Sequence, residues 1–169
     1  CSLYNAVRMS LSLRVTSMAL MRSRSIERLP NQPTKGIIMK ALEGIRVIEL
    51  CHAYNGPFCC MLLADQGAEV LKIEPLDGDQ CRGWYPFYEN GESAFFIMVN
   101  RNKKGGTLNL KDPEALEMFY ELVKTADVVV ENYRSGVAKK LKVDYESLRT
   151  INPRSIYAAS SGFGQYGPL

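Results

Sequence analysis

The sequence predicts an α/β protein, with a Rossmann-like, mostly parallel sheet and helices on both faces. Short β-rich apolar runs recur from residue 44 onward, segments with helical patterns lie between them, and glycine or proline marks many of the junctions. Strands that alternate with helices in this way pair in parallel, because each crossover returns the chain to the same end of the sheet.

The first predicted strand–helix–strand unit covers residues 44–73. Residues 44–50 (GIRVIEL) form a β-rich apolar run. Pro57 favours the start of a helix through residues 58–66, which Gly67 ends. Residues 69–73 (EVLKI) are predicted to be the second strand.

The middle of the chain is less regular. Residues 74–93 are rich in Pro, Gly and Asp and predict a long loop. Residues 94–99 are apolar and fit either a helix or a strand, whereas residues 107–110 (TLNL) alternate as in a short strand.

Asp112 and Pro113 form a well-defined helix start. Asp112 supplies the cap, Pro113 takes the first helical position, and Glu114 favours the positive end of the helix dipole. Apolar residues at positions 116, 119, 120 and 123 then share one face.

The last part continues the alternation. Residues 127–130 (DVVV) predict a buried strand, short helices are expected after Gly136 and over residues 144–150, and residues 155–159 (SIYAA) predict the next strand.

Length and charge indicate a single domain preceded by a leader. The chain has 169 residues with 46% hydrophobic and 23% charged content. Residues 1–38 carry six basic residues and one acidic residue (+5), whereas residues 39–169 carry 15 basic and 17 acidic residues (−2). A slightly acidic domain does not indicate a nucleic-acid partner.

Residues 1–38 predict a disordered leader without chemistry. They are rich in Arg and Ser, lack a steady apolar period and end near the PNQP cluster at 30–33. Two origins fit: a transit-like peptide, or upstream translation ahead of a start at Met39. The predicted domain is therefore 39–169.

The cysteines and the hydropathy favour a cytoplasmic protein. The five cysteines include no C-x-x-C pair, and His52 is the only histidine, so neither a disulfide framework nor a metal site is expected. No apolar run approaches the roughly 18 residues that span a bilayer, so no membrane partner is expected.

Three loops carry chemistry that suits an anionic ligand. Residues 51–57 (CHAYNGP) offer polar groups and N–H groups at a helix N-terminus, residues 100–106 (NRNKKGG) combine cations with glycines, and residues 131–136 (ENYRSG) follow a predicted strand. Taken alone, each is better explained as an ordinary turn; in the first, Gly56 would allow the bend and Asn55 would cap the helix. Residues 79–84 (DQCRGW) place the only tryptophan in a loop, where it either gates a pocket or packs on the surface.

Taken together, the ordered segments over residues 42–168 resemble the class III CoA-transferases (formyl-CoA transferase-like, CaiB/BaiF type). The matching segments are LEGIRVIEL, GPFCCMLLADQGAEVLKIE, GD followed by RGW, VNRNKKGGTLNLKDPEA, ADVVVENYRSGVAKKL and INPRSIYAASSGFGQYGP.

The resemblance implies transfer of coenzyme A from an acyl-CoA to a carboxylic acid, with no prosthetic group, by an interlocked homodimer whose large domain is Rossmann-like. It places CoA contacts at His52, Tyr54, Asn55, Leu108, Asn109, Leu110, Lys111, Asn132, Tyr133, Arg134 and Lys140, and an acyl-pocket contact at Trp84. Pro75 departs from the pattern, because formyl-CoA transferase has an arginine facing the nucleotide there; Arg82 is a possible replacement.

The resemblance also implies a catalytic aspartate, which forms a mixed anhydride and then an enzyme-bound CoA thioester. Its position in the family lies beyond residue 169, and no acid in this chain matches it, so we expect an N-terminal fragment without a catalytic residue. Two alternatives stay open: an α-methylacyl-CoA racemase of the same superfamily, and a non-catalytic CoA-binding lobe.

Overall fold

The computed structural model describes residues 16–17 and 40–165. The strands are β1 (Thr16–Ser17), β2 (Arg46–Leu50), β3 (Glu69–Glu74), β4 (Lys104–Thr107), β5 (Val128–Glu131) and β6 (Ile156–Ala159). The helices are α1 (Asn55–Asp65), the 3-10 helix η1 (Gln80–Gly83), α2 (Ala94–Asn100), α3 (Pro113–Val123), α4 (Val137–Lys140) and α5 (Tyr145–Arg149). The predicted leader over 1–38 lies outside the described residues apart from β1.

One sheet organises the domain, in the order β1-β4-β3-β2-β5-β6. The pairs from β4 to β6 are all parallel, and β1 alone is antiparallel. Numbered by themselves, the parallel strands have the Rossmann order 3-2-1-4-5, which confirms the predicted fold class. This order reverses direction between β2 and β5, and ligands bind at that switch point, outside the carboxyl ends of the strands.

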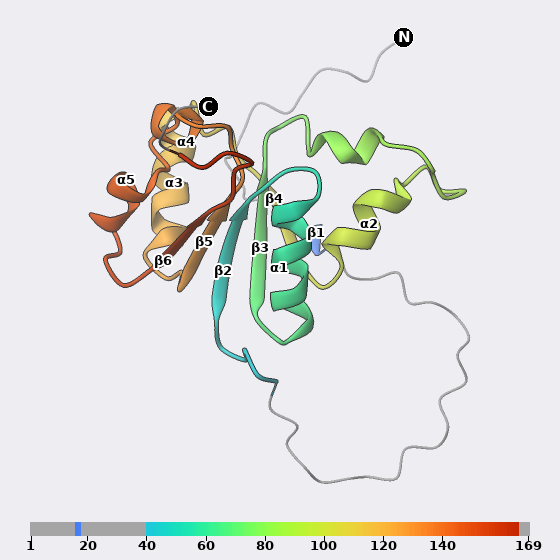
Figure 1. The fold of residues 1–169 in the computed structure, drawn as a ribbon, viewed down its shortest axis with the longest axis horizontal. Coiled ribbons are helices and arrows are strands. Elements are labelled where there is room, and N and C mark those ends of the chain that lie inside the picture. The colour runs from blue at the N-terminus through green and yellow to red at the C-terminus, as the bar shows by residue number, and fades with distance from the viewer. Residues whose placement is uncertain (1–15, 18–39, 166–169) are drawn as a thin grey trace, which may run out of the picture.

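Helices cover both faces of the sheet (Figure 1). On one face, α1 packs its Cys60 and Ala64 against Val47 and Val70. On the other face, Phe119 of α3 joins a second buried cluster that includes Ile48, Ile73 and Leu148. Two faces buried in this way explain the continuous apolar runs of the central strands.

The start of α3 and the end of α1 follow the sequence signals, whereas α1 begins at Asn55, two residues before the proline predicted to open it. The Asp112 carboxylate accepts from the Glu114 N–H, Pro113 opens α3, and Phe119 and Val123 on its predicted face are fully buried. Gly67, just after α1, has a φ of 107°, a conformation that favours glycine. The Ser93 hydroxyl caps α2, which shows that the ambiguous run over 94–99 is helical.

Two expectations about the middle of the chain were wrong. The strand predicted over 107–110 lies earlier, at β4, because its partner β3 ends at Glu74, which is level with Thr107. Residues 108–111 instead form a turn, in which the Asp112 N–H donates to the Asn109 carbonyl at 2.8 Å. The predicted loop over 74–93 also contains η1, capped by Asp79.

The thiols of Cys51, Cys59, Cys60 and Cys81 are free, as predicted. Within residues 16–17 and 40–165, no helix combines the length and the apolar character needed to cross a bilayer.

Candidate functional site: a cleft at the switch point

A cleft of about 450 Å³ opens at the carboxyl ends of the central strands. It lies between the loop after β2, the loop after β3, the turn after β4 and the loop after β5. Its lining residues are His52, Ile73, Glu74, Pro75, Leu76, Asp77, Leu108, Asn109, Leu110, Lys111, Tyr133 and Leu141. Six of the twelve residues carried over by resemblance therefore meet in one cavity: His52, Leu108, Asn109, Leu110, Lys111 and Tyr133.

Asn132 joins the loops after β2 and β5 with a set of 2.8 Å hydrogen bonds. Its Oδ1 accepts from the His52 N–H, and its Nδ2 donates to the His52 carbonyl and to Asn55 Oδ1. Asn55 Nδ2 in turn donates to the Ser160 hydroxyl, also at 2.8 Å, just after β6. Asn132 and Asn55 therefore fix His52 relative to three strand ends rather than line the cleft.

The first loop differs from the two roles proposed for it. Three of its N–H groups already have partners, because His52 donates to Asn132, Ala53 to Asp79, and Gly56 to Asn55 Oδ1, so these three are not free for an anion. Asn55 is the first residue of α1 rather than its cap. Gly56 is not needed for a bend: a Cβ there would lie 2.5 Å from Cys51 Cβ, so glycine lets the helix approach Cys51.

Two aromatic rings form one wall of the cleft. The His52 and Tyr133 ring centroids lie 5.6 Å apart at a tilt of 50°. Burial lowers the pKa of His52, and burial raises the pKa of Tyr133 to about 12. Both rings are therefore neutral near pH 7, and they offer flat apolar faces rather than charge.

The turn after β4 forms the facing wall. Leu108 is buried, Leu110 is half-buried, and Lys111 extends to the exposed rim. Asn109 Oδ1 accepts from the Lys111 N–H at 3.2 Å, which holds the turn. This wall supplies an apolar surface with one cation at its edge.

Pro75 lines the cleft at the position where the resemblance expects an arginine. Arg82 does not line the cleft; its guanidinium makes two 2.8 Å hydrogen bonds to Glu74 and lies 3.8 Å from the centroid of the Phe96 ring. Through this pair, Arg82 positions Glu74 at the cleft wall.

Arg134 and Lys140 are exposed beside the cleft rather than in it. Arg134 follows Tyr133, and Lys140 ends α4 directly before Leu141; Tyr133 and Leu141 both line the cleft. Each of these two cations thus lies next in sequence to a residue that lines the cleft.

Tyr54 and Trp84 belong to a different group. Tyr54 stacks on Phe58 at 5.5 Å, and Phe95 lies between Tyr54 and Trp84, at 5.9 and 5.0 Å. This aromatic cluster of Tyr54, Phe58, Phe95 and Trp84 gathers around α1 and α2, and none of its members lines the cleft. The sequence did not indicate Phe58 or Phe95, because their apolar character matches ordinary helix residues.

The sequence did not indicate some residues that line the cleft. Ile73 lies in a predicted strand, Glu74 begins the predicted loop over 74–93, and Leu141 follows α4, yet all three line the cleft. The sequence could have indicated the role of Lys72, which is fully buried in β3. A lysine inside a strand that is buried on both faces requires an acidic partner nearby.

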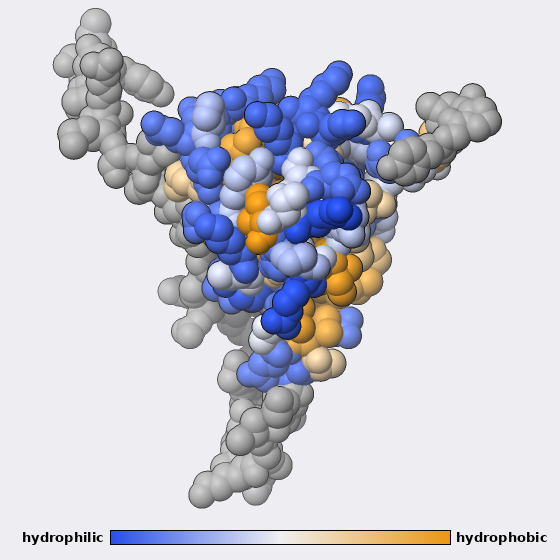
Figure 2. All heavy atoms as spheres, turned by 90° about the vertical axis from the view of Figure 1, so that its left-hand side faces the viewer, coloured by the Kyte–Doolittle hydropathy of each residue, from blue (hydrophilic) through white to orange (hydrophobic). Residues whose placement is uncertain are grey.

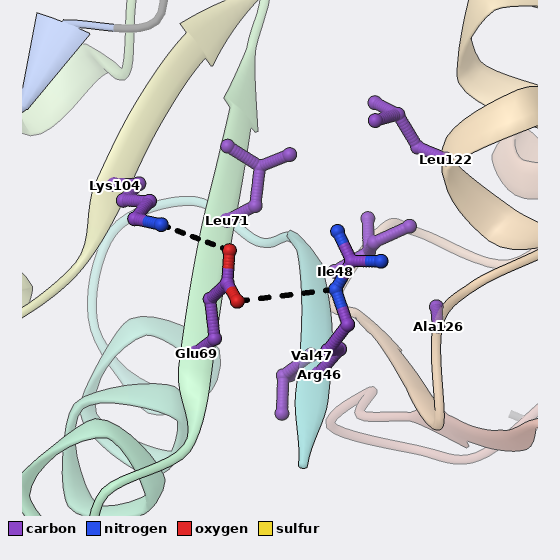
Figure 3. Close-up of a pocket in the computed structure, with 8 residues that line it drawn as sticks. All are labelled: Arg46, Val47, Ile48, Glu69, Leu71, Lys104, Leu122 and Ala126. Atoms are coloured by element: carbon purple, nitrogen blue, oxygen red, sulfur yellow. Dashed lines mark hydrogen bonds and ion pairs between the residues drawn. The ribbon is translucent and has the colours of Figure 1, made fainter. Parts of the chain in front are cut away.

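A smaller hollow of about 230 Å³ lies at the opposite, amino ends of the strands (Figure 3). Ile48, Leu71 and Leu122 contribute apolar side chains. On its polar side, Glu69 pairs with Lys104 at 2.9 Å and with Arg46 at 3.9 Å. No residue carried over by resemblance lines this hollow.

Comparison with known proteins agrees with the fold and with the order of the segments. Residues 42–169 match the model of "CoA-transferase family III". Acetyl-CoA:oxalate CoA-transferase of Acetobacter aceti is 50% identical over 128 residues, 75% of this chain and 33% of that protein. Succinyl-CoA:glutarate CoA-transferase of Mus musculus is 45% identical over 132 residues, 78% of this chain and 30% of that protein.

A solved structure supports the same relation. The crystal structure of a CAIB/BAIF family protein from Brucella suis superposes with a TM-score of 0.72 at 40% identity, over 76% of this chain and 35% of that one. The chain thus spans about a third of the length of the relatives it matches.

Proposed function

Since this chain belongs to CoA-transferase family III, we propose that the cleft at the switch point binds the nucleotide end of coenzyme A. The single observation that carries the proposal is the convergence of four separate loops on one cavity, with His52, Asn109 and Tyr133 in its walls.

The chemistry of the cleft fits a nucleotide. The rings of His52 and Tyr133, together with the side chains of Leu108 and Leu110, offer apolar surface for an adenine base. Lys111 lines the cleft, and Arg134 and Lys140 are exposed and lie next in sequence to the lining residues Tyr133 and Leu141, so three cations are candidates to meet the phosphate groups. Glu74 adds no free negative charge, because Arg82 neutralises it.

We further propose that the protein acts in CoA transfer between an acyl-CoA and a carboxylic acid. An aspartate oxygen would attack the thioester carbonyl and expel the CoA thiolate; the thiolate would then attack the aspartyl carbonyl and release the donor acid. The acceptor acid would take CoA by the reverse sequence. Five related proteins whose names describe CoA-transferases favour this reaction over the racemase.

We propose that the described residues bind coenzyme A but do not supply the nucleophile for its transfer. Two acids in or beside the cleft are held in ion pairs, because Glu74 is bound by Arg82 and Asp79 is buried against Lys72. Asp77 also lines the cleft and is exposed, but it does not match the position of the family's aspartate. We therefore propose that the described residues bind coenzyme A, with Trp84 at the acyl pocket, and that the aspartate nucleophile and the interlocked homodimer are features of the whole family architecture.

Calorimetric titration tests the proposal directly. The chain is expected to bind CoA and acetyl-CoA, and to bind pantetheine, which lacks the nucleotide, much more weakly. Lys140→Ala is expected to weaken CoA binding by about three- to tenfold, and added salt should weaken it further. Lys139→Ala is the matched control, because Lys139 lines a different hollow beside β6.

If neither CoA nor acetyl-CoA produces a heat of binding, the proposal is refuted. Equal affinities for CoA and pantetheine would refute its assignment to the nucleotide end.

A further inference from the structure

Four charged side chains lie completely buried beneath the loop that carries His52. Lys72 Nζ lies 3.0 Å from both Glu49 Oε1 and Asp79 Oδ2, and Lys103 Nζ lies 2.7 Å from Glu49 Oε2. All four side chains have an exposed fraction of 0%. Two positive and two negative charges balance, so removal of any one leaves an uncompensated charge in the interior.

The charged network forms hydrogen bonds to the loop backbone on both sides of His52. Lys72 Nζ donates to the Cys51 carbonyl at 2.6 Å, and Asp79 Oδ1 accepts from the Ala53 N–H at 3.3 Å. Asn132 holds the N–H and the carbonyl of His52 itself. The backbone of three successive residues is thus fixed by side chains from β3, from the loop after β3 and from the loop after β5.

These hydrogen bonds hold Ala53 in a strained backbone conformation. Its φ is 63°, a left-handed value that non-glycine residues rarely adopt because it is strained. Such a conformation persists where the surroundings over-determine it, and the Asp79 carboxylate supplies that restraint at the Ala53 N–H.

Stability alone does not explain a buried ionic network, because apolar residues of similar volume stabilise a protein interior equally well or better. Apolar side chains cannot direct a donor at one carbonyl and an acceptor at one N–H. On the basis of the proposed function, we infer that Lys72 and Asp79 are positioning residues, which hold His52 in the orientation that coenzyme A meets in the cleft.

The double variant Lys72→Met/Asp79→Asn separates positioning from stability. It removes one positive and one negative charge and leaves the Glu49–Lys103 pair balanced. The amide introduced in place of the Asp79 carboxylate retains an oxygen for the Ala53 N–H, but the donor to the Cys51 carbonyl is lost. The unfolding temperature is expected to stay within a few degrees of the wild-type value, while the Kd for CoA rises roughly tenfold, the effect of one charge-assisted hydrogen bond.

His52 supplies a readout that does not depend on CoA. As the only histidine of the chain, it gives one unambiguous set of imidazole signals in an NMR spectrum. The double variant is expected to weaken the NOE contacts between these signals and the ring of Tyr133, whose centroid lies 5.6 Å from that of His52, whereas a role confined to stability or to local charge would leave these contacts in place once the unfolding temperature is retained.

The matched control is Lys104→Met/Glu69→Gln, a charge-balanced change in the pair at the opposite end of the sheet (Figure 3). It is expected to leave both the Kd and the His52–Tyr133 NOE contacts unchanged. If the Lys72/Asp79 variant behaves like this control, the inference is overturned. If the wild-type chain fails to bind CoA, the proposed function fails, and the His52–Tyr133 NOE contacts alone decide the positioning role.

Hydrogen exchange in the wild-type chain covers the case in which the double variant does not fold. The N–H groups of His52 and Ala53 are expected to exchange as slowly as those of β2, although they lie in a loop. Rapid exchange at both would overturn the inference.

Discussion

Asn132 shapes the cleft through its hydrogen bonds although it does not line it. Asn132→Ala removes hydrogen bonds to the His52 N–H, the His52 carbonyl and Asn55 Oδ1 at once. We expect the free energy of unfolding to fall by about 1–3 kcal/mol, because backbone groups of His52 lose their partner. CoA affinity should fall as well, measured by calorimetry at a temperature at which the variant is fully folded.

Asn90→Ala serves as the control for this change. Asn90 accepts from the Glu92 N–H in an exposed turn, so its loss should leave the affinity unchanged. An Asn132→Ala variant with wild-type affinity would contradict the conclusion that the Asn132 hydrogen bonds shape the cleft.

His52 makes the stability of the folded chain depend on pH. Burial lowers its pKa, so the unfolded chain, in which histidine titrates near 6.5, binds more protons between the two values. The free energy of unfolding therefore rises with pH in this window: the contribution is present above 6.5 and is lost as the pH falls through the folded pKa. Urea unfolding at pH 7.5 and 5.0 measures it.

His52→Gln is the reference for that measurement, because other groups also contribute to the pH dependence, among them Glu131, whose pKa is raised by burial. The difference between wild type and His52→Gln should shrink at the lower pH. A difference that grows as the pH falls would show that the His52 pKa is raised instead.

At the scale of elements, the approach of α1 to the end of β2 depends on Gly56. Gly56→Ala would place a Cβ 2.5 Å from Cys51 Cβ and closer still to its Sγ. We expect overpacking to destabilise the fold by about 1–3 kcal/mol and to weaken CoA binding through displacement of the adjoining loop. Thermal unfolding and calorimetry measure the two effects.

Gly83→Ala provides the comparison, since a Cβ at Gly83 would meet nothing within 4 Å. Equal unfolding temperatures for the two variants would show that α1 can shift away from Cys51 at little cost.

The elements also show where sequence signals succeed. The cap and proline of α3 lie within three residues, and the structure confirms that start. The position of β4 was wrong because TLNL has the alternating pattern of a strand, whereas KGGT, which lacks that pattern, is the segment that lies level with β3. Strand register depends on the partner strand, which a local pattern does not contain.

At the scale of the whole molecule, β6 forms one edge of the sheet. Among the described strands it pairs with β5 alone, and Ile156 is 65% exposed. The side of the molecule that carries β6 and α5 is mostly hydrophilic, with hydrophobic residues exposed in patches (Figure 2). Exposed edges of this kind promote association between chains.

Ile156→Lys is expected to reduce that association, because a lysine at the edge opposes pairing with a second copy. Light scattering over a range of concentrations measures the effect, and Ile156→Val, which keeps the edge apolar, should associate like the wild type. Since Ile156 lies outside the cleft, CoA affinity should not change; unaltered association of the lysine variant would exclude the β6 edge as the contact.

The sequence by itself determined the α/β alternation, the helix boundaries marked by caps and glycines, and the family segments over residues 42–168. It could do so because periodicity, capping and turn chemistry act over a few neighbouring residues.

Only the tertiary structure decided which residues form the cleft. It placed His52, Leu108 and Tyr133 in one cavity, moved Tyr54 and Trp84 to a separate aromatic cluster, and buried Lys72 with Asp79 beneath the loop. Strand order and the packing of side chains from distant segments set these relations, and both depend on contacts between residues that are far apart in the chain.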